Sequence, residues 1–99
     1  MSADKINLPI NAKNSIISLA KKYDINKVLL FGSRARGDNR ERSDIDLAIT
    51  GGDVTGFACD IEDEADTLLM FDVVDLDAAV QKELLDVIKK EGVIIYEKV

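Results

Sequence analysis

The stretch FGSRARGDNRERSDIDLAIT, residues 31–50, runs from the last residue of one predicted β-strand, through a connection, to the end of a second predicted β-strand. Residues 27–31, KVLLF, form a short apolar run, and residues 44–50, DIDLAIT, alternate an acid with an apolar residue before becoming apolar. The connection is too short for a crossover helix of normal length, so we expect the two strands to be antiparallel. The connection itself has two interpretations: a phosphate-handling loop that leads to metal-binding carboxylates, or an ordinary polar loop.

Hydrophobic periodicity predicts three helices and two further strands around this pair. They are a helix over 10–22, a helix over 55–70, a strand over 71–76, a helix over 78–90 and a strand over 93–97. The result is a small mixed sheet of about four strands flanked by helices, α/β or α+β in class, within one domain that spans residues 1–99.

The two later helices carry specific expectations. The 55–70 helix should face inward with Phe57, Ile61, Ala65, Leu68 and Leu69, and its acidic residues Asp60, Glu62, Asp63, Glu64 and Asp66 should form a solvated face. Asp77 is the predicted N-cap of the last helix. That helix should turn Val80, Leu84, Val87 and Ile88 inward, carry Lys89 and Lys90 in its last turn and be capped by Gly92.

Composition limits the classes of function. The 99 residues contain no histidine and a single cysteine, which removes imidazole bases, internal disulfides and zinc motifs. The net charge of −6 argues against broad nucleic-acid binding, which depends on a basic surface. Residues 1–10 contain no long apolar run, so we expect neither a signal peptide nor a membrane span, and a cytoplasmic location.

Asp44 and Asp46 are candidate metal ligands. Alternation along a strand directs both side chains to one face, with attachment points about 6.6 Å apart at a rise of ~3.3 Å per residue. Carboxylate oxygens without histidine or thiolate favour Mg²⁺ or Mn²⁺. The alternative is that Asp44 caps a turn and Asp46 is merely exposed.

Asp72, in FDVVD, is a possible third acid of the same site. A carboxylate at the start of an apolar strand is unfavourable unless it is paired or bound. If the 71–76 strand lies beside residues 44–50, Asp72 joins Asp44 and Asp46 on one face and becomes the candidate general base. Otherwise Asp72 is an exposed acid at the edge of the sheet.

Gly32 and Ser33 are the candidate phosphate-binding residues. Glycine after a buried strand allows a phosphate to approach the backbone N–H groups closely, and Ser33 adds a hydroxyl donor. All four arginines of the chain, Arg34, Arg36, Arg40 and Arg42, follow within nine residues. Their guanidinium groups suit phosphate, although a solvated loop would also contain them.

Together these residues read G-S-x-A-x-G-x5-S-D-x-D-L, which resembles the signature of the DNA polymerase beta-like nucleotidyltransferases, in particular the minimal (MNT) proteins. The resemblance covers nearly the whole chain and implies the nucleotidyltransferase fold. It implies that Gly32 and Ser33 hold the triphosphate of ATP and that Asp44, Asp46 and Asp72 are the catalytic, metal-binding triad. Ser43 of the motif and Arg34 are further candidates for nucleotide binding, the latter from its chemistry rather than from the motif.

Minimal members of this family typically accompany a HEPN-domain protein in a toxin–antitoxin module. The resemblance therefore implies an Mg²⁺-dependent (or Mn²⁺-dependent) antitoxin that transfers AMP from ATP to a hydroxyl of a HEPN ribonuclease, in a hetero-oligomer. Two alternatives remain open: an antitoxin that acts by binding alone, and nucleotidyl transfer to a small molecule or nucleic acid.

Overall fold

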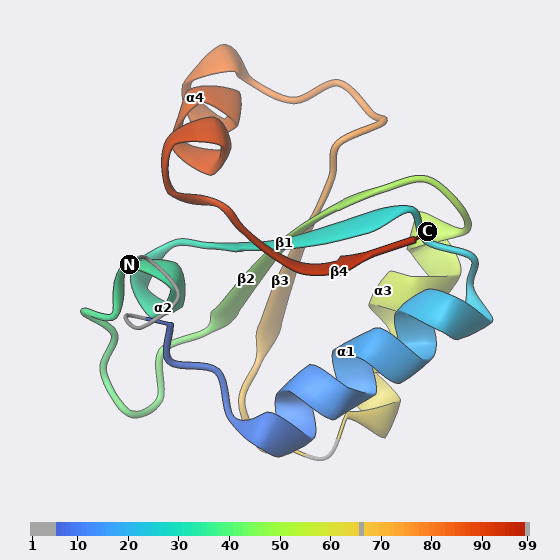
Figure 1. The fold of residues 1–99 in the computed structure, drawn as a ribbon, viewed down its shortest axis with the longest axis horizontal. Coiled ribbons are helices and arrows are strands. Elements are labelled where there is room, and N and C mark those ends of the chain that lie inside the picture. The colour runs from blue at the N-terminus through green and yellow to red at the C-terminus, as the bar shows by residue number, and fades with distance from the viewer. Residues whose placement is uncertain (1–5, 66, 99) are drawn as a thin grey trace.

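The computed structural model describes residues 6–65 and 67–98 and contains alternating helices and strands (Figure 1). Along the chain these elements are α1 (Ile10–Lys22), β1 (Lys27–Phe31), α2 (Ser33–Arg36), β2 (Ile45–Thr50), α3 (Val54–Glu64), β3 (Phe71–Asp75), α4 (Lys82–Glu91) and β4 (Val93–Glu97). The predicted fold class is confirmed.

The four strands form one mixed sheet in the order β3-β2-β1-β4. β1 is antiparallel to β2, which confirms the pairing expected from the short connection, and it is also antiparallel to β4. β2 and β3 are parallel, and α3 crosses over between them. Parallel neighbours require such a crossover, whereas an antiparallel pair does not.

One face of the sheet packs against α1 and α3, and this is where the main core lies (Figure 1). β1, β2 and β3 contribute buried apolar side chains to it, and the partly buried Val93 and Ile95 of β4 pack against it, because successive residues of a strand point to opposite faces. The strand members of this core are Val28, Leu30, Ile45, Leu47, Ile49 and Phe71, and the helices add Ile16, Leu19, Phe57 and Ile61. Full burial of each large side chain contributes about 1.5–3 kcal/mol.

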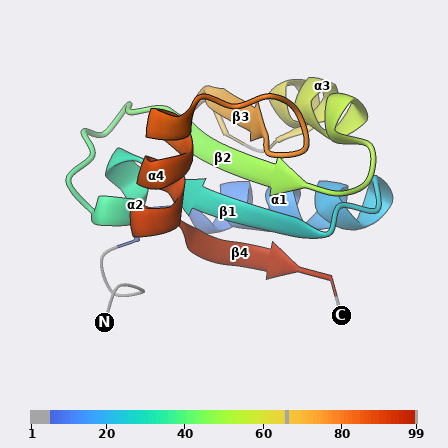
Figure 2. The same cartoon turned by 90° about the horizontal axis from the view of Figure 1, so that it is seen from above.

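The opposite face carries α4, which crosses it near the end of β1 (Figure 2). A smaller buried cluster forms there from Phe31, Ala48 and Ile88. The alternation that places Ile45 and Leu47 in the main core therefore places Asp46 on the face that α4 covers only in part.

The predicted 55–70 helix is too long at its C-terminal end. α3 ends at Glu64, and Ala65 has extended backbone angles, φ −66° and ψ 136°. The carboxylate of Glu62 accepts a hydrogen bond from the N–H of Phe71 (3.1 Å), so the chain turns back at once toward β3. Leu68 is fully exposed at 103% rather than inward-facing. Asp66, assigned above to the acidic face, lies outside the described residues.

The last helix begins later than predicted, and Asp77 is not its N-cap. α4 starts after Gln81, whereas the Asp77 carboxylate accepts hydrogen bonds from the N–H of Gly51 (2.6 Å) and the hydroxyl of Thr50 (2.7 Å). Val87, expected inside, is 41% exposed. Gly92 does follow the helix, but in an extended rather than a left-handed conformation.

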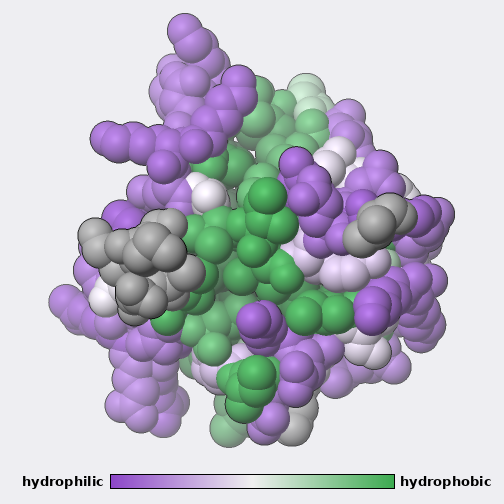
Figure 3. Space-filling model, in the orientation of Figure 1, coloured by the Kyte–Doolittle hydropathy of each residue, from purple (hydrophilic) through white to green (hydrophobic). Residues whose placement is uncertain are grey.

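Within residues 6–65 and 67–98, no helix combines the length and the apolar character that a membrane span needs. Figure 3 shows the surface in the view of Figure 1: an apolar area lies in its middle, over β4, with polar side chains around it. Ile94 of β4 is half exposed.

Candidate active site

Gly32 follows β1 and is the point at which the two halves of the site meet. Its φ of +77° is a left-handed conformation that side chains disfavour. A Cβ atom at this position would also collide with Oδ2 of Asp46. Glycine is therefore required both by the backbone conformation and by the close approach of the acid.

Asp46 and Asp72 are direct neighbours across the parallel strands β2 and β3. Asp44 precedes β2, two residues before Asp46, so the predicted strand is one residue shorter at its start. Asp46 is half-buried, whereas Asp44 and Asp72 are exposed. The structure thus places Asp72, the expected third acid, beside Asp46. The carboxylates of Asp44 and Asp72 are open to an incoming molecule.

Burial raises the pKa of the Asp46 carboxyl above its ordinary value, and the negative charges of Asp72 and Asp44 raise it further. The Arg36 guanidinium acts in the opposite direction, and Glu91 adds to the increase. Ionisation of Asp46 is therefore less favourable than that of an ordinary aspartate. A bound cation would stabilise the ionised form.

The acid site fits a divalent cation by its chemistry. Among the described residues, no three acidic or cysteine side chains are gathered closely enough to hold an ion by themselves. Mg²⁺ binds through one or two carboxylates and fills its remaining positions with water and substrate phosphate oxygens. Asp46 with Asp44 or Asp72 can supply the carboxylates that such a site needs.

Arg36 and Glu91 belong to this site, and the sequence did not single out Glu91. The Oε1 atom of Glu91, in the last turn of α4, accepts hydrogen bonds from the N–H of Gly32 (3.0 Å) and from Nη1 of Arg36 (2.9 Å). Nε of Arg36 also donates to Asp38 (3.0 Å). The hydrogen bond to Asp38 raises the pKa of Arg36, and the hydrogen bond to Glu91 raises it further. Gly32 and Glu91 are 59 positions apart in the sequence, so no local pattern predicts their contact.

Arg34 does not face the acids, and the prediction that it binds nucleotide does not fit its position. The residue is 2% exposed. Its guanidinium donates to the backbone carbonyls of Ser43 (Nε, 2.9 Å), Asn7 (Nη1, 3.0 Å) and Glu41 (Nη2, 3.0 Å). Arg34 therefore holds the loop in shape, because each of its three nitrogens already donates to a carbonyl.

The two candidate serines occupy different positions. Ser33 follows Gly32 directly as the first residue of α2. Its phosphate-binding role stays a prediction. The Ser43 hydroxyl accepts a hydrogen bond from the N–H of Arg40 (2.8 Å). Ser43 thus closes the loop before Asp44 through both its hydroxyl and its carbonyl.

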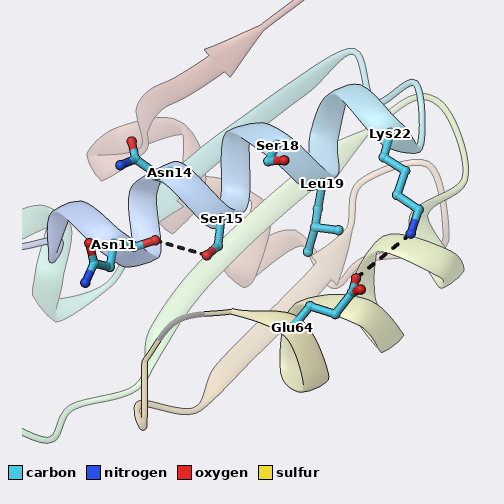
Figure 4. Close-up of a pocket in the computed structure, with 7 residues that line it drawn as sticks. All are labelled: Asn11, Asn14, Ser15, Ser18, Leu19, Lys22 and Glu64. Atoms are coloured by element: carbon cyan, nitrogen blue, oxygen red, sulfur yellow. Dashed lines mark hydrogen bonds and ion pairs between the residues drawn. The ribbon is translucent and has the colours of Figure 1, made fainter.

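A separate groove of about 510 Å³ lies on the helical side of the molecule (Figure 4). Its lining residues come from α1 and the end of α3: Asn11, Asn14, Ser15, Ser18, Leu19, Lys22 and Glu64. α1 and α3 cover the sheet face opposite the acids. We therefore place the reactive site at the acids and not in this groove.

Residues 14–99 match the family model described as polymerase beta, nucleotidyltransferase. A 41-residue stretch is 51% identical to a protein of Methanocaldococcus jannaschii named "Putative protein adenylyltransferase MJ0604". That match covers 39% of this chain and 41% of the relative, so it spans less than half of the relative's length.

The fold is similar to two solved toxin–antitoxin structures. One, a toxin–antitoxin with AMP-PNP, has a TM-score of 0.70 and 26% identity over 87% of this chain and 73% of that chain. The other, a variant of the toxin–antitoxin MntA-HpeT, has a TM-score of 0.68 and 25% identity over 93% of this chain and 75% of that chain.

Proposed function

The chain belongs to the polymerase beta nucleotidyltransferase family, and from this premise we propose that it transfers AMP from ATP to a hydroxyl group of a partner protein. The observation that carries the proposal is the convergence of Gly32, Asp46 and Asp72. Gly32 lies so close to Asp46 that a Cβ atom would collide with the carboxylate, and Asp72 is the neighbour of Asp46 on the next strand. A relative named as a protein adenylyltransferase supports the type of reaction.

In this proposal Gly32 and Ser33 hold the triphosphate, and Asp44, Asp46 and Asp72 hold divalent cations, Mg²⁺ or Mn²⁺. The bound cations would neutralise phosphate charge and stabilise the charge that develops in the transition state. Arg36 replaces Arg34 as the phosphate-facing arginine, because its guanidinium lies beside Gly32 and acts on the charge of Asp46.

Asp72 is the proposed general base. The acceptor hydroxyl gives its proton to the Asp72 carboxylate while its oxygen bonds to the α-phosphorus of ATP. The bond from that phosphorus to the β-phosphate bridging oxygen breaks, and pyrophosphate leaves. Asp72 is exposed on β3, an edge strand, where a hydroxyl on a large acceptor can reach it.

We further propose that the acceptor is a HEPN-domain toxin and that this chain is its cytoplasmic antitoxin, in a complex of the two proteins. The similarity to toxin–antitoxin structures supports a toxin partner. The HEPN identity comes from the resemblance of the motif.

The test is transfer of label from [α-³²P]ATP to the co-purified partner in the presence of Mg²⁺. Asp46→Asn and Asp44→Asn should each lower the transfer rate about a hundredfold or more, because metal ions supply several kcal/mol of transition-state stabilisation. Asp63→Asn is the matched control, since Asp63 is an exposed acid of α3 on the other side of the molecule. Full activity in both site variants would refute the proposal.

The same variants separate the alternatives. If they still neutralise the toxin and its mass never changes, the chain is an antitoxin that acts by binding. If label reaches a small molecule or nucleic acid while the partner's mass is constant, nucleotidyl transfer is confirmed and the proposed protein acceptor is wrong.

A further inference from the structure

Glu91 is the acidic residue of the site that the proposed reaction does not use. Its side chain is 19% exposed and reaches from α4 to the end of β1. There one oxygen, Oε1, accepts from two donors, the N–H of Gly32 and Nη1 of Arg36.

These two donors are of the kind that binds phosphate. Backbone N–H groups next to glycine and a guanidinium both form strong, charge-assisted hydrogen bonds to anionic oxygens. A single N–H forms a well-aligned bond with one acceptor at a time. A phosphate oxygen can therefore use the N–H of Gly32 only after Glu91 has left it.

We propose that Glu91 is an internal competitor of the nucleotide: its carboxylate holds the phosphate-binding donors of Gly32 and Arg36 in the free protein and releases both when the triphosphate binds. This inference rests on the proposed function, because it requires ATP to bind at Gly32. It adds a residue that sets nucleotide affinity.

The surrounding charges favour competition over support. Glu91 and Asp46 meet at Gly32: Oε1 of Glu91 accepts a hydrogen bond from its N–H, and Oδ2 of Asp46 occupies the space beside its Cα. A triphosphate brings further negative charge to the same place. A carboxylate that stayed in contact with Gly32 would repel it.

The exchange needs only a rotation of one side chain. α4 is attached to the sheet through Ile88 and Leu84, which pack with Phe31 and Ala48. Arg36 keeps its bond to Asp38 when Glu91 leaves, so its guanidinium remains oriented while Nη1 becomes available.

The experiment is a calorimetric titration of the full chain with Mg–ATP. Glu91→Gln keeps the shape of the side chain and removes its charge, so it should bind Mg–ATP about tenfold more tightly than the wild type, because a neutral amide oxygen competes less well than a carboxylate for the donors of Gly32 and Arg36. Glu83→Gln, in the exposed first turn of the same helix, is the matched control and should bind like the wild type. In the nucleotide-free protein, the amide resonance of Gly32 should shift in Glu91→Gln and not in Glu83→Gln.

Weaker or unchanged binding by Glu91→Gln, with the wild type binding normally, would overturn the competitor role and leave the proposed function intact. Of these two outcomes, weaker binding would show that Glu91 supports nucleotide binding by orienting Arg36 toward the phosphate. Glu91→Ala gives the same comparison if the glutamine variant does not fold. Absence of Mg–ATP binding by every protein, the wild type included, would overturn the proposed function and this inference with it.

Discussion

Arg34 and Arg36 show how two residues of the same type, two positions apart, perform different tasks. Both belong to α2, yet the first is buried among backbone carbonyls and the second is exposed beside Glu91. A buried guanidinium is tolerated when its donors are satisfied. Arg34 therefore contributes to stability, and Arg36 contributes to the electrostatics of the site.

Arg34→Ala should be strongly destabilising. The substitution removes three charge-assisted hydrogen bonds and leaves the carbonyls of Asn7, Glu41 and Ser43 without them, so we expect a loss of about 3 kcal/mol or more in the free energy of unfolding. Urea denaturation measures the change. Arg42→Ala, an exposed arginine of the same loop, is the control and should stay within about 0.5 kcal/mol of the wild type. Equal midpoints for both variants would contradict the role assigned to Arg34.

At the scale of elements, the sequence predicted what local patterns determine. The antiparallel pair β1 and β2 and the helix α1 follow from periodicity and the length of the connection. Alternation predicted Asp72 on the face of Asp46 only on the condition that β3 pairs with β2, and the structure shows that pairing. These features depend on neighbours in the sequence or on the alternation of a strand. The Gly32–Asp46 contact was only partly foreseeable, because a glycine after a strand suggests a close approach without naming its partner.

The errors occur where tertiary contacts override local signals. Asp77 is a residue type that commonly caps helices, but in the fold its carboxylate accepts hydrogen bonds from the N–H of Gly51 and the hydroxyl of Thr50 instead. Leu68 has helical spacing, but the chain has already turned toward β3. The positions of Arg34 and Glu91 differ from what local patterns indicate for the same reason: their partners are set by the fold.

Asp77 gives a prediction about pH. Hydrogen bonds from the Gly51 N–H and then the Thr50 hydroxyl hold the pKa of the Asp77 carboxyl below its ordinary value. A lowered pKa in the folded state means that the ionised group stabilises the fold above the unfolded-state pKa, about 3.9, and that this stabilisation disappears as the pH falls through the folded-state pKa. Asp77→Asn should therefore unfold at lower urea than the wild type at pH 7, and the difference should shrink toward pH 2.

The difference between the two Asp77 proteins should be modest and should decrease with added salt, because Asp77 is exposed. Asp86→Asn, an exposed acid of α4, serves as the control. A difference in urea midpoint between wild type and Asp77→Asn that is as large at pH 2 as at pH 7 would contradict the ionic origin of the effect.

At the scale of the whole molecule, the sheet divides the protein into unequal halves. The α1 and α3 side contains most of the buried apolar residues, while α4 is attached through a cluster of three buried residues, Phe31, Ala48 and Ile88 (Figure 2). Local stability follows the density of buried contacts. The half that carries Glu91 is therefore the less firmly attached one.

Hydrogen exchange followed by mass spectrometry should detect this difference. Amides of α4 should exchange faster than those of the central strands β1 and β2, because α4 can detach without opening the main core. The helix α1, packed in the main core, is the internal comparison for a helix of similar length. Equal protection of α1 and α4 would show that the molecule opens as a single unit.

The contacts of Arg34 have a consequence for how the chain can vary in length. Its guanidinium ties α2 to the carbonyls of Glu41 and Ser43, so both ends of the loop are fixed, and its tip, residues 38–40, lies between these anchors along the chain. Extra residues inserted at that tip would lengthen the excursion without moving its base. Gly32 and Asp44 could then drift apart in the sequence of related proteins while their distance in space remained the same.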